Sequence, residues 1–190
     1  MYYFLGLNNK GGSLGETILQ PVLTYYYGWT MSSWNCCPNG QSHQSDPIAG
    51  FGPGNKVPFL SSFIYFTDPS LTTMQVYGSM FESGPELSGT WSVESQYCPT
   101  SDSCHTTWLN VTDAGREFVW IDATLETYYV ANCTMLSSGL MTFSDMKLTT
   151  QNRQGVYQSR SIGWENYTPT SACNGITTIV SSAQVTIKHN

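Results

Sequence analysis

Apolar and polar residues alternate in short runs along most of this chain, and helical periodicity is nearly absent. The runs are rich in Val, Ile, Thr, Tyr and Phe, and Gly, Pro, Asn, Asp or Ser separate them, which is the pattern of β-strands joined by turns. So many short strands in 190 residues predict an all-β sandwich or barrel. The predicted strands are residues 17–27, 30–36, 57–66, 72–81, 90–97, 106–111, 117–121, 124–133, 141–148, 156–162 and 176–188.

The longest stretch without a predicted strand is residues 38–56, which contains three prolines and several turn-forming glycines and asparagines. We expect a long loop here, and long loops in compact domains are often functional. No repeat, low-complexity segment or linker divides the chain. Since 190 residues are enough to bury a core, we expect a single domain over 1–190.

Composition narrows the possible partners. Charged residues make up 11% of the chain and aromatic residues 14%, the net charge is −6, and the pI is about 4.8. Such an acidic chain lacks the basic patch that nucleic-acid phosphates require, so we expect no nucleic-acid partner. No run is long and apolar enough to span a bilayer, so we expect no membrane span.

An even number of cysteines in a weakly charged β-rich chain indicates a disulfide framework. The six-residue separation of Cys98 and Cys104 suits a bridge across a loop, and a long-range bridge could join Cys133 to Cys173. The remaining pair is adjacent in sequence, so it bridges across a distorted peptide, pairs with other cysteines, or stays free. This pair is Cys36 and Cys37.

Three Asn-x-Ser/Thr triplets point to the same compartment. They begin at Asn110, Asn132 and Asn166. Such triplets are the acceptors of N-linked glycosylation, and together with the cysteines they favour a secreted, extracellular glycoprotein of a eukaryote.

Metal and cofactor motifs are missing from the sequence. The three histidines, His43, His105 and His189, show no zinc-binding spacing, and there is no CxxC pair or EF-hand loop. The segment 11–15 matches the G-x-S-x-G pattern of serine hydrolases, but an all-β chain lacks the strand, helix and α/β sheet that this motif needs. We therefore expect no metal and no organic cofactor.

Two predicted strands each contain a polar residue among apolar and aromatic neighbours. Alternation puts Gln20 on one face with Ile18 and Val22, and it puts Glu126 on one face with Tyr128. A carboxylate among apolar and aromatic neighbours needs a reason, because burying an unpaired charge is costly. A glutamate can accept a proton from water, and a glutamine amide can orient that water and stabilise an oxyanion.

These segments resemble the eqolisins, the secreted glutamic peptidases of fungi. The family has an Ile-Leu-Gln strand that ends in the catalytic glutamine, as in residues 18–20, and the Leu125-Glu126 pair resembles the strand that carries its catalytic glutamate. An aromatic cluster and a tryptophan-centred strand follow the glutamine, as in residues 25–34. The chain is similar also to small secreted fungal proteins related to that fold, which carry a Thr-Leu-Glu strand leading toward a cysteine, here Cys133.

The resemblance implies a concanavalin-like β-sandwich of two antiparallel sheets, stapled by disulfides. It also implies a secreted acid endopeptidase that acts on polypeptides. Glu126 would be the general base and then the acid, and Gln20 would stabilise the oxyanion. Trp29, Trp34 and Tyr128 would line the substrate groove.

The alternative is a non-catalytic secreted protein that binds glycans or another protein on the same scaffold. Exposed aromatic rings on a β-sandwich can stack on sugar faces, and the chain has an aromatic run between Tyr25 and Trp34. Two departures from the peptidase pattern favour this alternative. Pro21 directly follows the glutamine, and Ser33 stands where we expect an acidic residue in true peptidases.

Overall fold

The computed structural model describes residues 1–9, 17–26, 28–51, 60–67, 79–81, 88–100, 102–114, 120–128, 132–136, 140–151, 157–166 and 175–188. Within these ranges the chain forms β-strands and two short 3₁₀-helices, and no α-helix, so the all-β expectation is confirmed. The 3₁₀-helices are η1 (Pro38–Gly40) and η2 (Cys133–Met135). None of the helices in these ranges is long and apolar enough to cross a membrane.

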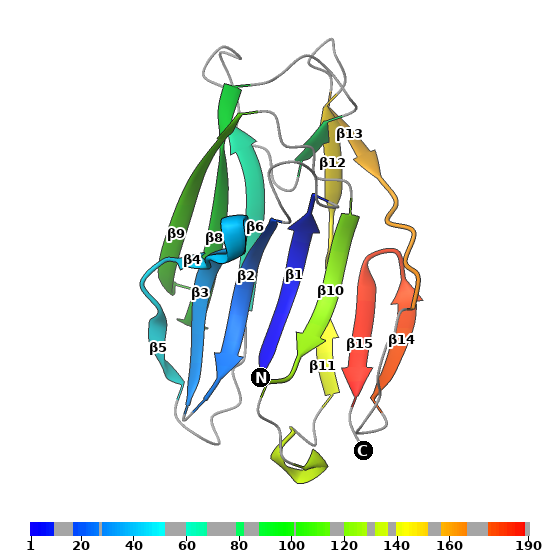
Figure 1. Ribbon diagram of the computed structural model, residues 1–190. Coiled ribbons are helices and arrows are strands. Elements are labelled where there is room, and N and C mark those ends of the chain that lie inside the picture. The colour runs from blue at the N-terminus through cyan, green and yellow to red at the C-terminus, as the bar shows by residue number, and fades with distance from the viewer. Residues whose placement is uncertain are drawn as a thin grey trace.

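A main sheet runs through the centre of the molecule in the order β10-β1-β2-β3-β4, with β5 also paired to β3, and all its pairs are antiparallel (Figure 1). The first strand of the chain, β1, therefore lies between two other strands and not at an edge of this sheet. The strands are β1 (Tyr2–Asn8), β2 (Ile18–Tyr25), β3 (Trp29–Cys36), β4 (His43–Gln44), β5 (Ile48–Phe51) and β10 (Trp120–Glu126).

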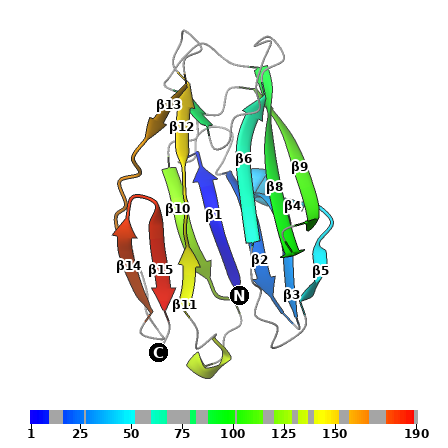
Figure 2. The same cartoon turned by 180° about the vertical axis from the view of Figure 1, so that it is seen from behind.

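A second sheet, in the order β6-β8-β9, lies against one face of the main sheet (Figure 2). Leu7 and Leu19 of the main sheet pack on Ile64, Trp91 and Val93 of the second, and Val93 and Leu19 are fully buried. Burial of apolar area between the two sheets is therefore what holds the layers together. The strands are β6 (Leu60–Thr67), β8 (Ser88–Thr100) and β9 (Ser103–Ala114).

Two small sheets lie beside β10, in the orders β11-β15-β14 and β13-β12-β7 (Figures 1 and 2). The β12–β7 pair is parallel, and the other pairs in these sheets are antiparallel. The strands are β7 (Ser79–Phe81), β11 (Leu140–Phe143), β12 (Leu148–Gln151), β13 (Tyr157–Arg160), β14 (Ile176–Ser181) and β15 (Gln184–Lys188).

Register sorts the side chains of the main sheet into two faces. Residues directly opposite one another in an antiparallel ladder point to the same side. The odd-numbered residues of β1, β2, β3 and β10 face the second sheet, as Leu7 and Leu19 do, and we call this the inner face. The even-numbered residues form the opposite side, the outer face.

Several strand expectations need correction. Residues 38–56 are not one long loop, because η1, β4 and β5 lie there, and both short strands pair with β3. The strand β1 was not predicted, and a single strand, β10, replaces the break expected at residues 122–123. Residues 141–148 and 176–188 each divide into parts of two strands. The glycine-rich segment 11–15 lies outside the described residues.

Candidate functional site

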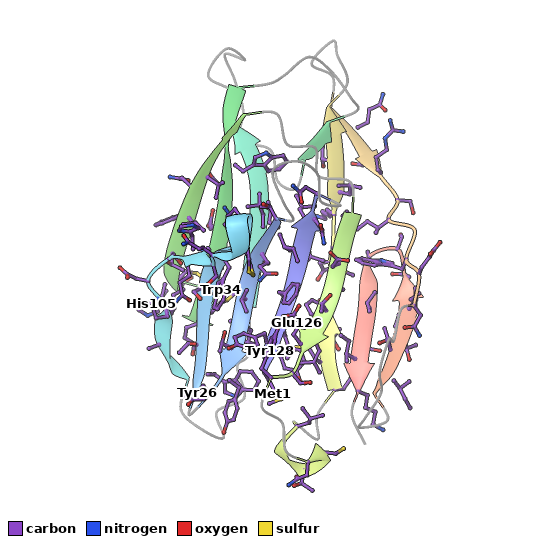
Figure 3. All side chains as sticks on the ribbon, viewed as in Figure 1. Met1, Tyr26, Trp34, His105, Glu126 and Tyr128 are labelled. Carbon is purple, nitrogen blue, oxygen red and sulfur yellow. A yellow bond between two sulfur atoms is a disulfide. The ribbon has the colours of Figure 1, made fainter. Side chains whose placement is uncertain are left out.

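An aromatic cluster, which we define as Tyr2, Trp34 and Tyr128, occupies the outer face. The Tyr2 ring is at the centre, with its centroid 5.8 Å from that of Trp34 and 5.7 Å from that of Tyr128, both in edge-to-face geometry. Tyr128 is 56% exposed, whereas the other two rings are partly buried. Figure 3 labels Trp34, on β3, and Tyr128, just past the end of β10. Strand β1 supplies the central ring, so the cluster could not be found without that strand.

Two apolar residues of the outer face are buried. Phe4 and Val22 lie opposite each other on β1 and β2, and they are 3% and 1% exposed although they point to the outer face. The Trp34 indole Nε1 donates a hydrogen bond to the Ser32 hydroxyl, which lies opposite Val22. This bond restrains the indole, so the ring is oriented before any ligand arrives.

Glu126 supplies a carboxylate at the edge of the cluster. It lies opposite Tyr2 in the β1–β10 ladder, and its Oε2 accepts a hydrogen bond from the Tyr128 hydroxyl at 3.1 Å. The negative charge of Glu126 is the largest of the causes that raise the pKa of Tyr128, followed by desolvation. The site therefore combines ring faces and edges with a charged hydrogen-bond acceptor.

Gln20 also lies on the outer face, opposite Trp34 in the β2–β3 ladder. It is only 5% exposed, and within the described part of the chain its Oε1 has no hydrogen-bond partner. Pro21 follows it inside β2, and the β1–β2 ladder has no pairs between Phe4–Val22 and Leu7–Leu19. A proline has no N–H to donate, which accounts for an interruption at this point.

Register separates Gln20 from Glu126. The β1–β2 pairs before and after the interruption share one register, which places Gln20 opposite Gly6. Glu126 lies opposite Tyr2 in the β1–β10 ladder. The offset is four residues along β1 and two strands across it, roughly 16 Å between Cα atoms. The two residues share a face on next-adjacent strands, as expected, but they do not lie opposite each other across the ladder, so a shared water would need both side chains extended toward one another.

Asp122 is the carboxylate at the level of Gln20. It pairs with Gly6 from the other side, so the row across three strands reads Gln20, Gly6, Asp122. A Cβ on Gly6 would approach the Ile18 Cγ2 to 2.9 Å, so a larger residue at position 6 would have to displace that side chain. Sequence reasoning missed Asp122, because its signal is a register between strands about 100 residues apart.

Two residues that the resemblance drew attention to lie on the inner face. Trp29 packs against the buried pair Met31 and Ile48, so the structure does not bring it to the outer face with Trp34. The Ser33 hydroxyl is 2.9 Å from that of Ser95 on β8, and both residues are fully buried. Position 33 therefore contributes to the contact between the sheets.

The disulfides follow the expected framework in part. Cys98 and Cys104 form the predicted bridge, and Cys36 and Cys37 bridge each other across a cis peptide bond. Cys133 is also disulfide-bonded, but its expected partner, Cys173, lies outside the described residues. Within the described ranges, no three His, Cys, Asp or Glu side chains gather in a way that could hold a metal ion.

The three predicted glycosylation sites, Asn110, Asn132 and Asn166, are all exposed. Asn110 lies in β9. Asn132 caps η2, with its Oδ1 accepting a hydrogen bond from the Thr134 backbone N–H at 3.1 Å.

Comparison with known proteins finds no family model that matches this chain, and no similar curated protein or solved structure. The functional argument therefore depends on the geometry of the outer face.

Proposed function

We propose that this chain is a secreted glycan-binding protein, built on a concanavalin-like β-sandwich, whose binding surface is the aromatic cluster together with Glu126. The observation that carries the proposal is the arrangement of three rings and one carboxylate on an outer sheet face that the second sheet does not cover. The disulfides support an oxidising, extracellular location.

The chemistry of the cluster suits a saccharide. A sugar ring presents an apolar C–H face that can stack on an aromatic ring, and its hydroxyl groups can donate to a carboxylate. Tyr128 offers the most exposed ring, and Glu126 lies at hydrogen-bonding distance from its hydroxyl. The hydrogen bond from the Trp34 indole to Ser32 restrains that ring, which lowers the entropy lost on binding.

The proposal is tested by titrating soluble oligosaccharides of cellulose, chitin and β-1,3-glucan into the protein and measuring heats by calorimetry. We expect binding to at least one series, and a loss of at least tenfold in affinity for Tyr128→Ala. Trp108→Ala is the matched control, because Trp108 is also an exposed aromatic residue, at 54%, but lies on β9 of the second sheet. Equal losses in both variants, or no binding to any series, would contradict the proposal.

A second candidate function is the acid endopeptidase that the eqolisin resemblance implies, with Glu126 as general base and Gln20 as oxyanion stabiliser. One observation favours it: the Gln20 amide is nearly buried on the same face as Glu126, and its oxygen has no partner in the ranges that the structure describes. The four-residue offset between the two residues weighs against it.

The peptidase candidate has its own test. The chain should cleave an unfolded protein substrate at about pH 3–5, because the resemblance implies an acid endopeptidase. Glu126→Gln should abolish cleavage without unfolding the chain, and Gln20→Ala should slow it at least about a hundredfold. If the wild type cleaves and Glu126→Gln keeps its rate, this mechanism is wrong. If the wild type cleaves nothing at acidic pH but binds a glycan, the first candidate stands.

A further inference from the structure

Asn110 and Trp108 are neighbours on one surface of the second sheet. Both side chains are exposed, Trp108 at 54%, and both residues belong to β9, which lies at the edge of that sheet (Figure 1). Successive side chains of a strand alternate between faces, so residues two apart point the same way at a separation of about 7 Å. The indole therefore lies beside the asparagine, on the side of the sheet that faces away from the inner core.

The amide of Asn110 is oriented by a neighbouring strand. The Ser92 hydroxyl on β8, directly opposite Asn110 in the ladder, donates a 2.8 Å hydrogen bond to the asparagine Oδ1. Because the oxygen is engaged by this donor, the nitrogen Nδ2 is the amide atom directed elsewhere. Nδ2 is the atom to which an N-linked glycan attaches.

The sequence contains this spacing twice. Both Trp108-Leu109-Asn110-Val111-Thr112 and Trp164-Glu165-Asn166-Tyr167-Thr168 place a tryptophan two residues before a glycosylation asparagine. The structure distinguishes the two. Trp164 is not in a strand, and its indole Nε1 donates a 3.0 Å hydrogen bond to the Ser182 carbonyl. The Trp164 ring is thus hydrogen-bonded to another segment, whereas Trp108 lies on a strand and its ring is exposed.

We propose that Asn110 carries an N-linked glycan and that the first N-acetylglucosamine of this glycan packs against the indole of Trp108. In the attachment reaction, Nδ2 bonds to the anomeric carbon of an oligosaccharide carried on a lipid diphosphate. The bond from that carbon to the diphosphate oxygen breaks, the diphosphate leaves with the electron pair, and Nδ2 loses a proton. The donor and the transferase belong to the secretory pathway of the host.

The contact gives the exposed indole a defined partner. The C–H face of the sugar covers apolar ring surface that water would otherwise contact, so the modified chain is more stable than the unmodified one. It also covers an exposed apolar residue on an edge strand, where unprotected strands tend to pair with other chains. This inference concerns the second sheet and is independent of the glycan-binding surface proposed for the main sheet.

The test uses the full chain secreted from a eukaryotic host and trimmed with an endoglycosidase that leaves one N-acetylglucosamine on each occupied asparagine. Peptide mass spectrometry first measures occupancy of Asn110. Thermal unfolding is then measured for four proteins: the wild type, Asn110→Gln, Trp108→Ala and the double variant. This cycle cancels the loss of the Ser92 hydrogen bond, which is common to both Asn110→Gln proteins.

We expect Asn110 to be occupied, and we expect Asn110→Gln to lower the melting temperature about 2–4 °C more when Trp108 is present than when it is alanine. Trp108→Phe should keep most of this coupling, because it keeps a ring. The same cycle with Trp164 and Asn166 is the matched control, and it should show no coupling of this size. An unoccupied Asn110, or equal effects of Asn110→Gln in both backgrounds, would overturn the proposal.

Discussion

Replacing Gln20 with methionine should stabilise this protein. Gln20 is 5% exposed, and its Oε1 has no hydrogen-bond partner among the described residues, so we expect the folded state to carry the desolvation penalty of a buried acceptor. Around it lie Ile18, Val22 and the Trp34 indole on the same face. Methionine has nearly the same length and shape as glutamine and no strong acceptor, so it fills the same space without the penalty.

The size of the effect follows from two opposing contributions. An unsatisfied buried polar group costs about 1–3 kcal/mol. A volume-conserving replacement in a packed site costs less than about 1.5 kcal/mol in imperfect fit. The expected net gain is about 1 kcal/mol, which corresponds to a rise of about 2–4 °C in melting temperature for a chain of this size.

Urea unfolding, followed by tryptophan fluorescence, measures this gain. The midpoint should rise by about 0.5 M with an unchanged m-value. Gln44→Met is the matched control: Gln44 lies opposite Trp34 on the other side from Gln20, but it is exposed, so its replacement should change stability by less than about 0.5 kcal/mol. If urea unfolding shows that Gln20→Met is destabilised by about 1 kcal/mol or more, then Oε1 has a partner in the folded protein and the reasoning is wrong.

Three further outcomes are expected. Leu19→Ala should lose about 2–5 kcal/mol in a denaturant titration, because Leu19 is fully buried between the sheets. Ser33→Ala should lose about 1–2 kcal/mol in the same assay, because it leaves the buried Ser95 hydroxyl without this partner. Glu126→Gln should lower the pKa of Tyr128, measured by NMR titration, because the Glu126 charge is the largest cause that raises it. The raised pKa means that the folded state keeps the Tyr128 proton longer, so its contribution to stability is present below about pH 10 and falls as the pH rises further.

Alternation predicted most of the strands and the shared face of Gln20 and Glu126. It did so because, within one strand, the side of each residue follows from its parity. The same rule applied to β3 separates Trp29 from Trp34, since they are five positions apart, and the sequence alone could have placed Trp29 on the opposite face from Trp34. The strand β1 escaped notice for the opposite reason: most of its residues are buried on both faces, so apolar residues follow one another without alternation.

Whether a residue number is odd or even cannot predict the register between strands that are distant in sequence. The pairing of β1 with β10 joins Gly6 to Asp122 and Tyr2 to Glu126, across more than one hundred residues of chain. A slide of two residues would keep every side chain on its face and yet change every neighbour. Whether Gln20 meets a carboxylate, and which one, is decided at this level. The short strands β4 and β5 escaped prediction similarly, since pairing with β3 defines them more than their own composition does.

The register also separates the two candidate functions experimentally. Glu126 adjoins the aromatic cluster through Tyr128 and Tyr2, whereas Gln20 lies four residues further along the sheet, level with Asp122. Binding at the cluster should therefore tolerate Gln20→Met, because that change leaves every ring in place. A peptidase that needs the glutamine amide should lose its activity in the same variant, since a thioether cannot stabilise an oxyanion. One substitution that stabilises the fold thus gives opposite results for the two functions.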